Sequence, residues 1–166
     1  TRSQIDLLRS PLHLHLLAGV AAVSGGWRST SDLLAAYWDR KRTDVIAKKP
    51  STQFSETIQY LAETMSARQQ LSILESEVDS AGRWSDVLAL EGEGVIVRDS
   101  GRVAFFHEMF FDYAFARAWA LRQESLTAFL LDGEQELFVR AQVRQILYYL
   151  RATEVQRYRK EFLELV

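Results

Sequence analysis

Apolar residues recur every three or four positions along several stretches of the chain, which is the spacing of amphipathic helices. In the first such stretch, Leu12, Leu16 and Val20 mark one face of a helix. Ser10 and Pro11 precede this face as an N-cap and a first helical residue. The same spacing recurs further along the chain, so three helices are expected in the first part, over residues 11–24, 30–42 and 51–67.

Capping signals support the boundaries of these helices. Ser29 and Asp32 have the spacing of a capping box at the start of the second helix. The basic residues 40–42 mark its expected end, and Pro50 precedes the third helix. Glycine and proline are scarce along the whole chain, with eight and two residues, which favours long helices over turn-rich sheets.

The middle of the chain has a different pattern, with four of the eight glycines between residues 82 and 101. Two short helices are expected over 73–81 and 84–91, the first opened by a capping box of Ser72 and Glu75. Two β-branched or aromatic runs then flank the loop Asp99-Ser100-Gly101, which predicts a β-hairpin. A helix, two short helices and a hairpin are the element order of a winged helix-turn-helix.

After the hairpin the pattern is helical again. A helix that begins near residue 107 has aromatic residues on more than one side, so it is expected to be buried centrally. Further helices are expected near 124–131, 134–151 and 153–165. The predicted fold class is therefore mainly α: a helical segment, a winged helix-turn-helix with one β-hairpin, and a C-terminal helical segment. The corresponding division is 1–48, 49–123 and 124–166.

Composition and charge narrow the function classes. The 166 residues are 48% apolar and carry a net charge of −2, which is typical of a globular protein and disfavours nucleic acid as a partner. The chain has no cysteine, which indicates a reducing compartment, and the cytoplasm is expected. The longest uncharged run, 10–27, is too short and too polar to span a membrane. Because the chain begins at Thr1, we expect it to be part of a longer protein.

No catalytic motif is present in the sequence. A phosphate-binding G-x-x-x-x-G-K-[ST] loop is absent, as is a G-x-S-x-G turn. His107-Glu108 begins like a zinc-protease motif, but position 111 is Phe instead of the second His. His13 and His15 point about 200° apart on a helix and cannot share a metal ion. We therefore expect neither enzymatic activity nor a metal site in this chain.

Two segments resemble parts of a known family. Residues 105–116 follow the predicted hairpin and consist of an aromatic pair, His107 and an aromatic helix. This segment resembles the end of the winged-helix domain in NACHT-type STAND NTPases. Residues 9–14, in which Pro11 precedes a leucine-rich helix, are similar to the lid-helix segment of those ATPases. The resemblance covers residues 5–123, and residues 124–166 more loosely as the start of a helical region. Arg9 and Ser10 depart from the small or Asn/Gly residues that often precede the family's proline.

The resemblance implies a regulatory role in signal transduction, bacterial defence included. His107 would contact the β-phosphate of ADP, and Pro11 would lie near the adenine. The nucleotide and Mg²⁺ would be bound by an upstream domain of the parent protein, so this chain itself would hold no cofactor. The implied partners are that upstream domain, a downstream sensor region and, on activation, further copies of the protein.

Other interpretations of the same residues remain open. His107 could instead cap or pack the strand-to-helix corner, and Pro11 could be only a helix starter. Asp112 and Tyr113 are expected to be structural. The alternative functions are a winged-helix DNA-binding module and a helical protein-interaction domain. DNA binding is disfavoured because the second short helix and the hairpin offer few clustered cations.

Overall fold

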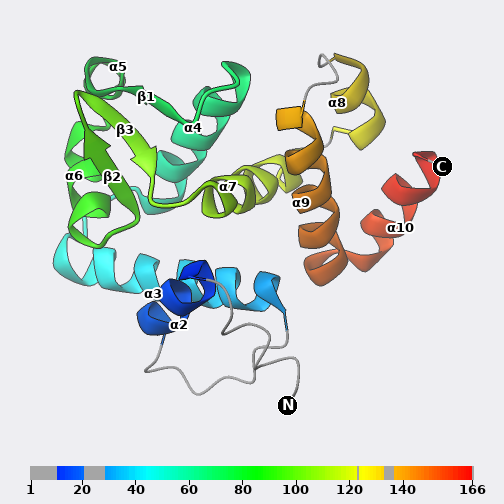
Figure 1. Ribbon diagram of the computed structural model, residues 1–166, viewed down its shortest axis with the longest axis horizontal. Coiled ribbons are helices and arrows are strands. Elements are labelled where there is room, and N and C mark those ends of the chain that lie inside the picture. The colour runs from blue at the N-terminus through cyan, green and yellow to red at the C-terminus, as the bar shows by residue number, and fades with distance from the viewer. Residues whose placement is uncertain (1–10, 21–28, 123, 133–136, 166) are drawn as a thin grey trace. The chain divides into compact units, whose positions relative to one another are not determined.

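The computed structural model describes residues 11–20, 29–122, 124–132 and 137–165 (Figure 1). These residues form a mainly helical protein with one small sheet. In chain order the elements are α2 (Pro11–Val20), α3 (Thr30–Lys48), α4 (Phe54–Ala67), β1 (Ser72–Leu74), α5 (Glu75–Ser80), α6 (Trp84–Gly92), β2 (Ile96–Asp99), β3 (Arg102–Phe105), α7 (Glu108–Ala120), α8 (Leu126–Asp132), α9 (Leu137–Thr153) and α10 (Val155–Glu164).

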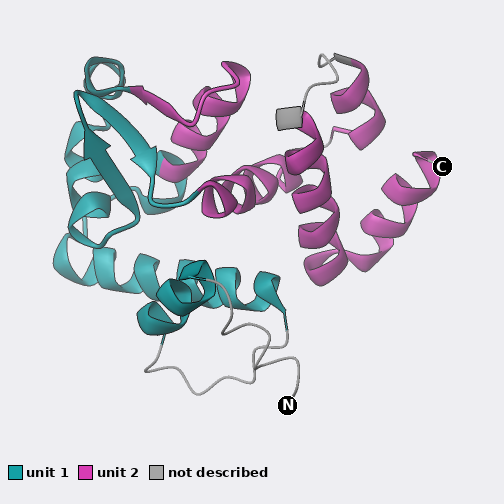
Figure 2. Cartoon of the chain, in the orientation of Figure 1, with its two compact units in different colours: residues 1–57, 74–107 teal, residues 58–73, 108–166 magenta. Residues whose placement is uncertain are grey.

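The chain divides into two compact units (Figure 2). Unit 1 comprises residues 1–57 and 74–107, and unit 2 comprises residues 58–73 and 108–166. The division into 1–48, 49–123 and 124–166 made from the sequence stays a prediction. Within the described residues, no helix is long and apolar enough to cross a membrane.

In unit 1, the helices α2 and α3 pack against each other. Pro11 is the first described residue of α2, whereas Ser10 and the expected end of that helix at Gly25-Gly26 lie outside the described residues. The predicted capping box of α3 is confirmed: the Ser29 hydroxyl accepts from the Asp32 amide, and the Asp32 carboxylate accepts from the Ser29 amide.

The predicted end of this helix at residues 40–42 is wrong, because α3 continues to Lys48. Arg40 pairs with Asp44 one turn later at 2.8 Å, and Val45 in the next turn is buried. A basic run with acidic partners at i+4 and an apolar residue beyond it is therefore compatible with the interior of a helix.

The element order from α4 to β3 is that of a winged helix-turn-helix, as predicted, with the strands in the order β1-β3-β2. The sequence did not predict β1, and the proposed capping box of Ser72 and Glu75 is wrong. The N-cap of α5 is Leu74, in extended conformation and without a side-chain hydrogen bond. In the predicted capping box the Glu75 amide would donate to the Ser72 hydroxyl. In the structure this amide donates instead to the Gly101 carbonyl, at 3.0 Å. The third helix also begins later than predicted, at Phe54.

The hairpin is confirmed, but its turn is shorter than predicted. Asp99 pairs with Arg102, which leaves Ser100 and Gly101 as a two-residue turn. Both turn residues have positive φ, 50° and 75°, as a type I′ turn requires. Glycine adopts this conformation without strain, which explains its place at the second position.

In unit 2 the aromatic helix α7 is the best-buried element, with nine of its 13 residues buried, as its sequence predicted. It packs against α9, where Tyr113 meets the Tyr149 ring edge-on at 5.8 Å. Trp119 and Phe115 both contact Phe129 of α8. Within the described residues after α7, the helices α8, α9 and α10 agree with the expected C-terminal helical segment.

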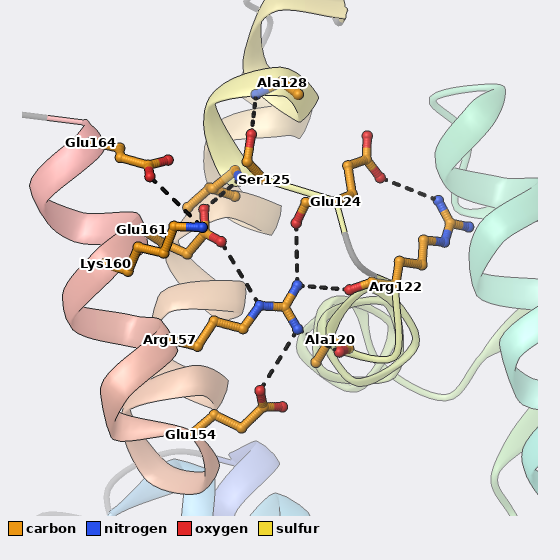
Figure 3. A network of polar contacts seen from close by, with 11 residues as sticks. Ala120, Arg122, Glu124, Ser125, Ala128, Glu154, Arg157, Lys160, Glu161 and Glu164 are labelled. Carbon is orange, nitrogen blue, oxygen red and sulfur yellow. Dashed lines mark hydrogen bonds and ion pairs between the residues drawn. The ribbon is translucent and has the colours of Figure 1, made fainter.

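A polar network around Arg157 joins α10 to the end of α7 and the start of α8 (Figure 3). The Arg157 guanidinium donates to the carbonyls of Ala120 at 2.6 Å, Arg122 at 2.8 Å and Glu124 at 3.2 Å. Buried Glu161 lies 3.8 Å from Arg157 Nε and accepts from the Leu126 amide at 2.6 Å. The Arg157 side chain thus satisfies one carbonyl at the end of α7 and two carbonyls beyond it, which have no helical hydrogen-bond partner.

A cluster of imidazole and ammonium groups in unit 1

The two residues singled out by the sequence both lie on the surface of unit 1. Pro11 is exposed at the start of α2. His107 is exposed between the end of β3 at Phe105 and the start of α7 at Glu108. The described structure therefore places His107 at the strand-to-helix corner that its sequence predicted.

A third residue, His15 of α2, lies close to this corner. The His15 ring packs on the Phe106 ring at a centroid distance of 4.8 Å. Tyr37 of α3 completes the cluster, with its ring 5.2 Å from Phe106 and its hydroxyl 3.5 Å from His15 Nε2. The helices α2 and α3 and the residues after β3 thus converge at one place on unit 1.

The electrostatics of the cluster show which charged groups face one another. The pKa of His15 is lowered by partial burial of its ring, by the positive charge of Lys41 and by His107. Lys41 Nζ lies 5.4 Å from the centre of the Tyr37 ring. His15, Lys41 and His107 therefore gather three nitrogen-bearing side chains on one surface, where each could donate an N–H to a bound anion.

One carboxylate also faces the cluster. The pKa of Tyr37 is raised, first by burial and then by the negative charge of Glu93. Glu93 also pairs with Lys48, whose exposed Nζ lies 2.5 Å from its Oε1. The Tyr37 hydroxyl donates to the Gly94 carbonyl at 3.5 Å, which holds the tyrosine between α3 and the start of the hairpin.

The position of Tyr37 depends on a close approach of α2 to α3. A Cβ atom at Gly19 would lie 2.7 Å from Tyr37 Cε2, which is closer than van der Waals contact allows. Tyr37 is almost fully buried, so its ring has little room to move. Gly19 thus lets the two helices pack closely enough for His15 and Tyr37 to meet.

Sequence reasoning missed His15 and Lys41. His15 follows Pro11 by four residues, so both share one face of α2, and this spacing was the available signal. His13 points elsewhere, with its Nε2 3.1 Å from the Thr30 hydroxyl. The different neighbours of His13 and His15 agree with the predicted divergence of the two rings. Among the described residues, no group of three or more histidine or acidic side chains is placed to hold a metal ion.

Asp112 lies on α7 in unit 2, and its structural role stays a prediction. Burial, together with the negative charge of Glu108, raises its pKa to about 6, while Arg144 acts in the opposite direction. Asp112 therefore changes charge at mildly acidic pH. Tyr113 beside it is buried, as a structural residue would be.

The contacts around the winged-helix elements do not favour DNA recognition. Arg98 in the hairpin pairs with Glu91 at 2.7 Å and Glu75 at 3.5 Å, and its guanidinium lies over the Trp84 ring. Asp86 near the start of α6 accepts hydrogen bonds from the Gln53 amide and the Thr57 hydroxyl. The guanidinium that the hairpin could offer to phosphates is thus occupied within the protein, and near the start of α6 the chain presents a carboxylate, which phosphates repel.

No protein-family model matches the chain, and no curated protein matches it.

Proposed function

We propose that this chain is the non-catalytic regulatory part of a larger, STAND-like signalling ATPase, which closes on ADP in the resting state. The observation that carries the proposal is the convergence of His15, half-buried Lys41 and His107 around the Phe106 and Tyr37 rings on one surface of unit 1. In this proposal the surface faces the phosphates of ADP bound by an upstream domain, and signal-dependent opening breaks the contact.

The chemistry of the three side chains supports this role. A neutral imidazole still donates one N–H, and a lysine ammonium donates three. A hydrogen bond to a charged acceptor contributes about 1.5–3 kcal/mol. One such bond changes the ratio of closed to open states by a factor of about 10–150, which is sufficient for a switch.

The remaining parts of the proposal concern the parent protein. Pro11 lies one helical turn before His15 on the same face of α2, which agrees with a position near the adenine. The phosphate loop and Mg²⁺ belong to the upstream domain, so the chain alone does not hydrolyse ATP. The proposed partners of this chain are that upstream domain, a downstream sensor region and, after activation, other copies of the parent protein. The proposed location is the cytoplasm. The proposal therefore requires that the parent gene encode a phosphate-binding loop upstream of Thr1.

The test is the substitution His107→Ala in the full-length protein, with His13→Ala as the matched control. His13 is a histidine of the same unit that bonds to Thr30 instead of joining the cluster. The proposal expects His107→Ala to release ADP about 10–150-fold faster and to raise basal signalling, with an unchanged melting temperature. A variant that melts earlier but retains ADP and stays silent would show that His107 only packs the corner.

A further inference from the structure

Unit 2 carries a groove that the proposed function does not use. It lies between α8, α9 and α10 and has a volume of about 370 Å³. Its floor consists of apolar side chains, among them Leu130, Val143 and Leu147. Tyr148 and Phe162, which are 51% and 44% exposed, border the groove. Large aromatic side chains exposed around an apolar floor are typical of protein-binding surfaces.

The charge of this groove has one sign. Three of the residues that line it are arginines, Arg140, Arg144 and Arg151, and none is acidic. All three are exposed. Within the part of the chain that the structure describes, none of the three forms an ion pair within 4.0 Å. Among the described residues that line the groove, there is therefore no carboxylate to complement these cations.

The arginines form a row along α9. Their spacings of four and seven residues are close to one and two helical turns, so the three side chains lie on one face. The row extends over about 17 Å, because each residue adds about 1.5 Å to the helix. Arg144 also faces Asp112, whose carboxyl belongs to α7 and does not line the groove. The groove is thus elongated, with an apolar floor and a basic edge.

We propose that this groove binds an acidic amphipathic helix of a partner protein. Apolar residues of that helix, spaced three and four positions apart, would fill the groove, and carboxylates beside them would pair with the arginine row. A flat membrane surface fits less well, because the floor lies between three helices. The inference stands on unit 2 alone and does not depend on the nucleotide proposal.

The test uses two synthetic fluorescein-labelled helical peptides of 16 residues. Both have leucines on one face, and they differ only in glutamates or lysines beside that face. The inference expects the acidic peptide to bind the chain at least about tenfold more tightly than the basic one, and to weaken as salt is added. Equal affinity of the two peptides, or no binding of either, would overturn it.

Variants locate the site. The triple variant Arg140→Glu, Arg144→Glu and Arg151→Glu should lose about tenfold in affinity for the acidic peptide and gain affinity for the basic one. Arg159→Glu on α10 is the control, because Arg159 is exposed but does not line the groove. Circular dichroism checks the fold, and the comparison of the two peptides on the unsubstituted chain remains valid if the triple variant unfolds.

Two other occupants would contradict the inference. Sedimentation of the chain with vesicles of phosphatidylglycerol and phosphatidylcholine, not prevented by excess acidic peptide, would indicate a lipid surface. Self-association that the acidic peptide does not reverse would indicate a second copy of the chain. The inference expects neither result.

Discussion

Substitution of Arg157 tests how much the polar network around it contributes to the stability of unit 2, compared with an exposed arginine on the same helix. Its guanidinium serves three backbone carbonyls at the end of α7 and beyond it, and covers the Trp119 ring at 4.8 Å. It also lies 3.8 Å from Glu161, a carboxylate that is only 3% exposed. In Arg157→Ala the carbonyls lose their donor, and buried Glu161 loses the guanidinium that lies beside it (Figure 3).

The expected loss of stability follows from these contacts. Breaking a buried ion pair by removal of one partner costs about 3–5 kcal/mol. The Arg157 side chain is 19% exposed, and water can reach some of the freed carbonyls, so the lower end of that range applies. We therefore expect the free energy of unfolding to fall by about 3 kcal/mol. Arg157→Lys should recover only part of it, because a single ammonium cannot reach all the carbonyls.

Urea denaturation followed by circular dichroism measures this difference. The matched control is Arg159→Ala, an exposed arginine on the same helix, which should change stability by less than about 0.5 kcal/mol. If Arg157→Ala and Arg159→Ala lower the free energy of unfolding equally, the network does not stabilise unit 2 and the reasoning is refuted.

Two further predictions concern titration and close packing. The pKa of Asp112 is raised to about 6, so between pH 4 and 6 the native state holds a proton that the unfolded chain releases, and stability falls as the pH rises through this window. Asp112→Asn should remove this fall and stabilise the protein at pH 7.5 by roughly 1–2 kcal/mol after solvent screening of the partly exposed carboxyl. An unchanged pH profile in urea titrations would contradict this. Gly19→Ala should lower stability by about 1 kcal/mol, because the clash with Tyr37 outweighs the helix propensity of alanine. Thermal melts measure this loss, and Ala18→Ser, at the exposed neighbouring residue, is the control.

The sequence predicted those parts of the fold that local patterns determine. The capping box of Ser29 and Asp32, the hairpin around Gly101 and the buried aromatic helix α7 are all confirmed. The strand β1 was missed because three residues carry no periodicity, and their conformation depends on pairing with a distant strand. The extension of α3 past residues 40–42 was missed because a basic run is equally compatible with a helix end.

The candidate cluster was predictable only in part. His107 was found through its place after the hairpin, and Pro11 through its place before a leucine-rich helix. His15 and Lys41 join His107 only when α2 and α3 pack together, and the glycine that permits this approach has no distinctive signal in a single sequence. The Arg157 network has the same origin, because its acceptors are backbone atoms that sequence patterns do not identify.

The most direct test of the central claim is an NMR titration of the three histidine rings of the chain with ADP, up to about 10 mM at constant ionic strength. Without an upstream domain we expect binding near 1 mM, about −4 kcal/mol, because few contacts must offset the cost of association. The account predicts that the His15 and His107 ring signals shift with ADP, that the pKa of His15 rises, and that His13 in the same spectrum stays unchanged. If His15 and His107 do not shift, or if His13 shifts equally, the cluster is not a phosphate site.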